Sequence, residues 1–214
     1  MKVTHLGHAC VLLETGSARL LIDPGVWSFD FEDLRDLDGV LITHQHLDHI
    51  DPVRLPSLMA ANQHAELIID PGTTAEVEKL GLPARVANVG DVIELGGATV
   101  TAVGGVHALI HADIEVPPNI GYVVDNGAFY HPGDSLHVPE QDITVLGLPL
   151  DAPWLRLGEA VDFYRAVNPK VALPIHEQTA SQKGIDIAHY RFRSLGPAGA
   201  RFEVPPVGTT IELN

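Results

Sequence analysis

The stretch LITHQHLDHID, residues 41–51, decides how this chain is interpreted. It places His44, His46, Asp48 and His49 within six positions, directly after an apolar run. Side chains two positions apart in a helix point in nearly opposite directions, so His44 and His46 could share a metal ion only from a loop. Asp48 and His49 are adjacent and are expected to point away from that pair, toward a second metal. The segment therefore predicts a loop at a strand end that supplies ligands to two cations.

Three more metal-capable side chains also follow apolar runs. His107 comes after TVTAVGGV, Asp134 lies in AFYHPGD, and His176 comes after VALPI. Because sites in α/β folds gather at the carboxyl ends of strands, we expect these side chains to meet the 44–49 segment. Three ligands and an open position suit zinc. The predicted arrangement has His44, His46 and His107 on one metal, Asp48, His49 and His176 on the other, and Asp134 as a carboxylate bridge.

The patterns along the first half predict strands followed by strand–helix alternation. Short Val-, Ile- and Leu-rich runs separated by Gly, Ser and Asp are typical of strands. A first helix is expected over 51–63, with Asp51 as N-cap and Pro52 at the first helical position, and a second helix is expected to end at Gly81. The predicted strands of this half are 8–15, 18–24, 38–43, 65–70, 84–89, 91–95 and 98–103.

The second half repeats this order of elements. Residues 120–134 predict a hairpin, with Asn126-Gly127 as a tight turn. An amphipathic helix is expected over 158–169, with a buried face formed by Ala160, Val161, Phe163, Tyr164 and Val167, and another helix over 184–196. The remaining predicted strands are 142–149, 170–175, 200–204 and 209–213. Together the halves predict two sheets packed face to face with helices outside.

Length and charge restrict the class of protein. A chain of 214 residues with 45% apolar composition forms one domain, which we place over 1–214. The formal charge of −15 argues against nucleic acid or an anionic membrane as a partner. The single cysteine, Cys10, excludes an internal disulfide framework. His5 and His8 interrupt the apolar stretch that a signal peptide would need, so we expect a cytoplasmic protein with no membrane partner.

The motifs of the chain resemble those of a known family. THQHLDH resembles the HxHxDH signature of the metallo-β-lactamase superfamily, and GGVH, HPGD and PIH match its later ligand motifs in order. LLIDP, which contains Asp23, resembles its first motif. More narrowly, HLGHACVLLE, the Pro-Asn-Ile-Gly stretch and PIHE are similar to the UlaG-like metal-dependent hydrolases. The resemblance implies an α/β chain with the four-layer αββα sandwich of the metallo-β-lactamase fold, a dinuclear site and hydrolysis.

Several residues near these motifs keep two interpretations. His111 could replace His107 as a ligand if the loop takes a different path. His8 either lines the pocket and orients a ligand or is satisfied within the sheet, and Asp23 is expected to orient a ligand or its loop. Trp27 and Trp154 are expected in core packing or a dimer contact, or as pocket walls.

The hypothesis for function is metal-assisted hydrolysis. Two divalent cations are expected, zinc first, with manganese or iron as alternatives. They would ionise water near neutral pH, and Asp48 would orient it toward a carbonyl or phosphorus. The expected partner is a small-molecule substrate, a lactone, ester or phosphodiester, in a pocket shaped by loops 24–33, 108–120 and 149–157. A nuclease of the same fold and a metal-binding sensor without turnover are the alternatives, and a homo-oligomer stays open.

Overall fold

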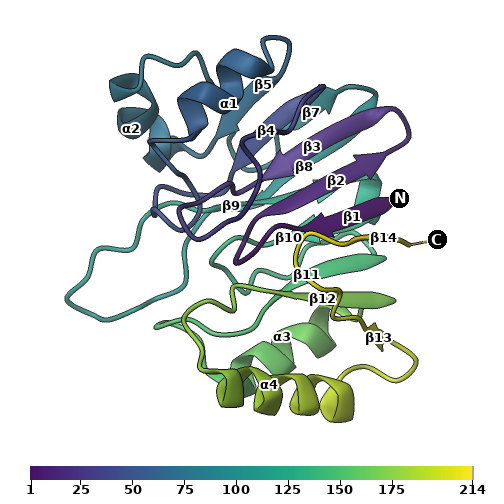
Figure 1. Cartoon of the computed structure of the whole chain (residues 1–214). Coiled ribbons are helices and arrows are strands. Elements are labelled where there is room, and N and C mark those ends of the chain that lie inside the picture. Colours follow the sequence, from purple (N-terminus) through teal and green to yellow (C-terminus); the bar gives the residue numbers. More distant parts are fainter. Residues whose placement is uncertain (214) are drawn as a thin grey trace.

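The computed structural model describes residues 1–213 and shows two seven-stranded sheets packed face to face, with helices on both outer sides (Figure 1). The first sheet has the order β14-β1-β2-β3-β4-β5-β6 and the second has the order β13-β12-β11-β10-β9-β8-β7. The strands of the first sheet are β1 Lys2–His5, β2 Val11–Thr15, β3 Ala18–Ile22, β4 Gly39–Ile42, β5 Glu66–Ile69, β6 Arg85–Val86 and β14 Thr210–Glu212. Those of the second are β7 Val92–Leu95, β8 Ala98–Gly104, β9 Ile120–Val124, β10 Phe129–His131, β11 Val145–Pro149, β12 Val171–Ile175 and β13 Arg201–Phe202.

Both sheets follow the same plan. Strands β1 to β3 and β7 to β10 pair antiparallel with their neighbours. The strands that follow, β4 to β6 and β11 to β13, add in parallel. Among the strands of residues 1–213, β14 alone joins the sheet of the other half, where it pairs antiparallel with β1.

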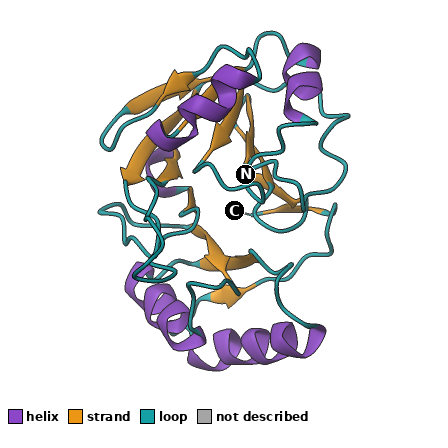
Figure 2. Ribbon diagram, turned by 90° about the vertical axis from the view of Figure 1, so that its left-hand side faces the viewer, coloured by secondary structure: helices purple, strands orange, loops and turns teal. Residues whose placement is uncertain are grey.

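Three apolar layers hold the sheets and helices together. The central layer joins the inner faces of the two sheets through side chains such as Leu13, Leu41, Tyr122 and Phe129. The second sheet packs its outer face on α3 (Leu157–Val167) and α4 (Gln182–Leu195), while the first sheet does the same with α1 (Leu55–Ala61) and α2 (Thr74–Lys79). Figure 2 shows the helices on the two outer sides of the sheets. The predicted four-layer αββα fold is therefore confirmed.

The predicted face of the helix over 158–169 is also confirmed, because Ala160, Val161, Phe163, Tyr164 and Val167 are all buried in α3. In the described part of the chain no helix is long and apolar enough to span a membrane.

Several element boundaries differ from the predictions. Asp51 does accept hydrogen bonds from Val53 N and Arg54 N, but residues 52–54 form a turn and α1 begins at Leu55. The helix predicted to end at Gly81 consists of a short 3-10 turn, η1 Pro71–Thr73, followed by α2, which ends at Lys79. The strand predicted over 84–89 is reduced to the two residues of β6 at the sheet edge.

The predicted hairpin is present with a longer turn. β9 and β10 pair with Val124 opposite Phe129, so residues 125–128 connect them, including the 3-10 turn η2 Asp125–Gly127. The Asp125 carboxylate bonds Thr15 Oγ1 and Thr99 N, 2.5 and 3.0 Å away, and these contacts with β2 and β8 account for the wider turn.

This topology brings the candidate ligands to one edge. β4 leads into the 44–49 loop, β8 into the His107 loop, β10 into Asp134 and β12 into His176. Because the carboxyl ends of these strands lie together, segments far apart in the sequence meet there.

Candidate metal centre

Two adjoining groups of donor side chains lie at this edge. Their ligand atoms fall within 4.8 Å of one another in each group. The first group contains His44, His46, His107 and Asp134, and the second contains His8, Asp48, His49 and His176. All seven side chains predicted as ligands are thus brought together, each in the group to which the sequence assigned it, with Asp134 at the junction and His8 as an addition.

Three of the histidines present a free nitrogen to the centre. His49 Nδ1 lies 2.6 Å from Asp23 Oδ2, His107 Nδ1 lies 2.6 Å from Ala108 O, and His176 Nδ1 lies 2.7 Å from Asp151 O. Since these oxygens only accept, each Nδ1 carries the proton and each Nε2 keeps its lone pair. Within residues 1–213 none of the three buried Nε2 atoms has a hydrogen-bond partner. This is the donor state that a divalent metal requires.

His44 is fixed in the same way by Thr43. The Thr43 hydroxyl donates to Asp23 Oδ2 at 2.7 Å, so its oxygen can accept from His44 Nδ1 at 3.0 Å. His44 Nε2 then lies 3.0 Å from His46 Nδ1. Burial, and then the neighbouring histidines, lower the pKa of both His44 and His46, which favours the neutral imidazole that binds metal.

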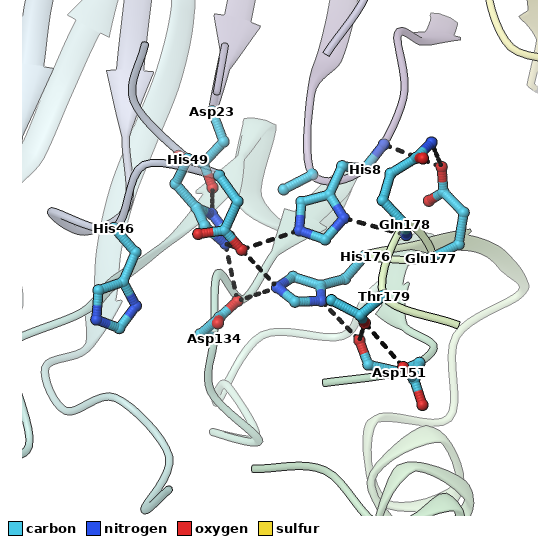
Figure 3. A network of polar contacts seen from close by, with 12 residues as sticks. His8, Asp23, His46, His49, Asp134, Asp151, His176, Glu177, Gln178 and Thr179 are labelled. Atoms are coloured by element: carbon cyan, nitrogen blue, oxygen red, sulfur yellow. Dashed lines mark hydrogen bonds and ion pairs between the residues drawn. The ribbon is translucent and has the colours of Figure 1, made fainter. Parts of the chain in front are cut away.

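Asp134 lies between the two groups (Figure 3). Its Oδ1 is 3.0 Å from His49 Nε2 and 3.2 Å from His176 Nε2, without the geometry of a hydrogen bond. Its Oδ2 is 3.3 Å from His107 Nε2 and 3.9 Å from His44 Nε2. One carboxylate oxygen therefore faces each group, which is the arrangement expected of a bridging ligand.

Asp48 is held by His8. The backbone N–H of Gln178 donates to His8 Nδ1 at 3.3 Å, so His8 Nε2 carries a proton and donates it to Asp48 Oδ2 at 3.0 Å. Asp48 Oδ2 also lies 3.4 Å from His176 Nε2. In this tautomer His8 orients Asp48, which is one of the two interpretations that the sequence left open for it.

The carboxylates of the centre raise the pKa values of two neighbouring histidines, His49 and His176. Burial alone would lower the pKa of His49, but Asp134 and Asp23 raise it well above its usual value. His176 behaves alike: burial is outweighed by Asp134 and Asp48, and its pKa rises to about 10. Burial would raise the pKa of Asp134, yet His49 and His176 hold it well below the usual carboxyl range. These carboxylates thus favour positive charge at the buried imidazoles, which a divalent cation on the free Nε2 atoms would supply, so the donor set fits divalent metals.

The backbone is strained where these side chains enter. His8, Asp23 and His176 have φ values of 51°, 50° and 63°, in the left-handed region that non-glycine residues avoid. Such conformations persist only where surrounding contacts fix them, and they cluster at functional sites. At His176, for example, the backbone N–H donates to His8 O at 2.8 Å.

The structure decides between His107 and His111, and it adds Trp154. The His111 side chain is 63% exposed and its Nδ1 accepts from Asp113 N, outside both groups. Trp154 is buried, and its Nε1 donates to Asp134 Oδ2 at 2.8 Å. Trp154 was expected in core packing, in a dimer contact or in a pocket wall. The sequence around it, LDAPWLRL, contains no motif that indicates a contact with Asp134.

Comparisons with known proteins give the family and support the fold. A family model described as "Beta-lactamase superfamily domain" matches residues 2–176. The chain is similar to Protein Rv0786c of Mycobacterium tuberculosis, with 50% identity over 199 residues that cover 91% of this chain and 92% of the relative. A UPF0173 metal-dependent hydrolase of Methanosphaerula palustris is 33% identical, and the alignment covers 100% of both chains. Among solved structures, Igni18, a metallo hydrolase from Ignicoccus hospitalis, has a TM-score of 0.76 at 22% identity, over 100% of this chain and 99% of that one.

Proposed function

The chain belongs to the metallo-β-lactamase superfamily, and from this premise we propose that it is a metal-dependent hydrolase with a dinuclear centre that cleaves a small ester or lactone. The observation that carries the proposal is Asp134, whose two oxygens face two groups of histidines with free Nε2 atoms. The M. palustris relative is named a metal-dependent hydrolase, and the Ignicoccus structure a metallo hydrolase. The narrower resemblance to UlaG-like hydrolases stays a prediction.

Each proposed metal site draws on both sheets. His44, His46 and His107 with Asp134 Oδ2 would hold one cation, and Asp48, His49 and His176 with Asp134 Oδ1 would hold the other. Two divalent cations there would supply Lewis acidity toward a carbonyl oxygen and make water nucleophilic near neutral pH. Zinc is the first choice for this ligand set, and imidazole and carboxylate also accept manganese or iron.

Asp48 would act as a ligand and an orienting group. Burial would raise its pKa, but the neighbouring His176 and the hydrogen bond from His8 hold the pKa well below its usual range, so Asp48 stays ionised and is a weak base. Its side chain is 18% exposed, whereas that of Asp134 is 4% exposed. Asp48 thus lies toward solvent, where it can position an incoming water.

The surroundings of the centre favour an uncharged electrophile. A cavity of about 340 Å³ beside His46 is lined by Leu47, Ile50 and Pro52. Another of about 460 Å³ beside Trp154 is lined by Leu109 and Leu136 together with Arg156 and Glu159. Loops 24–33, 108–120 and 149–157, predicted to shape the pocket, contribute six acidic residues and one basic residue, Arg156. An ester or lactone with an apolar part fits these walls better than an anionic nucleic acid.

The proposal is tested by metal analysis and hydrolysis with purified protein. We expect two metal ions per chain by elemental analysis, and turnover of p-nitrophenyl butyrate or a δ-lactone that exceeds turnover of bis-p-nitrophenyl phosphate. His46→Ala and Asp48→Ala should lower both metal content and turnover, while His111→Ala, outside both groups, should change neither. Full turnover by a metal-loaded Asp48→Ala protein would refute the assignment, and inactivity of the metal-loaded wild type across this panel would favour the sensor alternative.

A further inference from the structure

A second pocket lies next to the metal centre but outside it. Its volume is about 230 Å³, and it is lined by residues of β12, α4 and the segment 204–207. The walls are largely apolar, with Leu173, Ile185 and Val207 among them, and His5 and Glu177 also line the pocket. Figure 3 shows Glu177 on the side of His8 away from Asp134. The proposed hydrolysis makes no use of this pocket.

One carboxylate oxygen at this pocket, Glu177 Oε2, accepts no hydrogen bond from the described residues. Glu177 Oε1 accepts from His8 N at 3.0 Å and from Gln178 Nε2 at 3.1 Å. Glu177 Oε2 is buried and receives no hydrogen bond from the described part of the chain. The nearest basic group, His5 Nε2, is 3.6 Å away and already donates to His8 O at 2.8 Å, since a carbonyl only accepts. Leaving a buried charged acceptor unpaired is costly, so a donor from outside the chain is favoured there.

We propose that this pocket binds a small organic ammonium ion, with its charged nitrogen on Glu177 Oε2 and its hydrocarbon part on Leu173 and Ile185. Among the described lining residues there is no lysine or arginine to compete for the carboxylate. A charge-assisted hydrogen bond is the strongest that a carboxylate can accept. A cavity of roughly 150 Å³ holds benzene, so about 230 Å³ accommodates a body slightly larger, such as benzylamine.

Occupancy of the pocket is linked to the second group of donors through His8. Glu177 Oε1 bonds the backbone N–H of His8, and His8 in its left-handed conformation presents Nε2 to Asp48. A ligand that fixes Glu177 therefore fixes His8 and Asp48. Such coupling is reciprocal: metal binding should tighten the ammonium by about fivefold or more, and the ammonium should tighten the metal equally. This linkage rests on the proposed metal centre, whereas the pocket itself does not.

The full-length protein is titrated with benzylamine, with its neutral analogue benzyl alcohol and with the anion benzoate. Binding is measured by calorimetry and by NMR. We expect saturable benzylamine binding with a Kd at or below about 1 mM, at least about tenfold weaker binding of benzyl alcohol, and none of benzoate. Glu177→Gln keeps the acceptor for His8 N and should lose the preference for the amine. Ile185→Trp fills the pocket and should abolish binding, while the matched substitution Ile187→Trp, on the exposed face of α4, should not.

Each alternative result overturns the proposal. Absence of saturable binding in the wild type would mean that solvent alone satisfies Glu177. Equal binding of benzylamine and benzyl alcohol would exclude charge recognition, and binding that survives Ile185→Trp would place the amine elsewhere, including on a metal. The titration is repeated after chelation, so failure of the metal centre, seen in metal content, is distinguished from failure of the pocket.

Discussion

At the scale of single residues, the geometry of the centre depends on the ring nitrogens that point away from it, the Nδ1 atoms of three of its histidines. His49, His107 and His176 donate Nδ1 to an oxygen of the chain, and this leaves Nε2 free in a fixed direction. Asp23 contributes most to this support, because it also accepts from Thr43 N and Thr43 Oγ1, both at 2.7 Å. Removing such a support usually weakens metal binding without removing a ligand.

Asp23→Asn tests this support. The amide keeps the size of the side chain but replaces the charged acceptor for His49 Nδ1 with a neutral one. His49 Nε2 should therefore become less basic, and the ring should be less firmly oriented. We expect metal affinity to fall about 10- to 100-fold, measured by competition with a chromogenic chelator. Asp142→Asn, at an exposed position, serves as the control. Unchanged affinity in Asp23→Asn would show that Thr43 and packing alone orient His49.

Trp154→Phe tests the contact that the sequence did not reveal. The substitution keeps an aromatic wall and removes the N–H that Asp134 Oδ2 accepts at 2.8 Å. We expect metal binding about tenfold weaker and faster metal release to a chelator, because the bridging carboxylate loses its neutral donor. Trp27→Phe, whose ring contacts His8 at 4.8 Å between centroids, should have a smaller effect. Equal effects of the two substitutions would assign no special role to the indole N–H.

At the scale of elements, the ligand loop is held against the loop that follows β3. Val26 N donates to Leu47 O at 2.8 Å and Asp51 N donates to Pro24 O at 3.0 Å. Between them, Gly25 packs so closely that a Cβ built there would lie 1.9 Å from Asp48 O. Glycine is required here by close approach of two backbones.

Gly25→Ala should therefore displace Asp48 and its neighbours. We expect a loss of at least about 2 kcal/mol in the free energy of unfolding, measured by urea denaturation, together with loss of metal from the Asp48 site. Gly158→Ala in α3 is the matched control, since no described atom lies within 4 Å of its Cβ position and alanine favours a helix by about 0.5–1 kcal/mol. Native stability and metal content in Gly25→Ala would contradict the proposed packing of the two loops.

Asp70, directly after β5, should make the free energy of unfolding depend on pH. It caps η1 through Gly72 N and Thr73 N, and burial raises its pKa from 3.8 to about 6. The folded state thus holds the proton more tightly than the unfolded state. Its contribution to stability is full below pH 3.8 and is lost as the pH rises to about 6. In metal-free protein, the stability of wild type relative to Asp70→Asn should fall by about 1–3 kcal/mol between pH 4 and pH 7. A constant difference over that range would show that Asp70 has an ordinary pKa.

The sequence predicted the order of the elements and the grouping of the candidate ligands better than their contacts. That side chains such as His44 and His176 lie together was predictable, because each follows an apolar strand and strand ends converge in this class of fold. The start of α1 was wrong by several residues, since Asp51 caps a preceding turn instead of the helix. The contact of Trp154 with Asp134 and the close packing at Gly25 were not predicted, because both depend on how loops from different strands approach one another, which periodicity does not encode.

At the scale of the whole molecule, the centre joins two sheets. His44, His46, Asp48 and His49 follow β4 of the first sheet, whereas His107, Asp134 and His176 follow strands of the second. Cations bound between them would therefore link the two layers, and they would also offset part of the −15 formal charge. Binding to the folded state alone stabilises a protein by mass action, by about 2.7 kcal/mol per site at 100 times Kd.

Removal of metal should consequently lower the stability of the whole domain. For a chain of this length we expect Tm to fall by about 5–10 °C per site emptied, measured by calorimetry before and after dialysis against a chelator, with recovery when zinc is restored. Asp134→Asn, which weakens the bridge between both groups, should have a lower Tm in zinc than the wild type and should respond little to the chelator. If metal is lost from the wild type without a change in Tm, the cations do not link the sheets, and the layers are held by the apolar core alone.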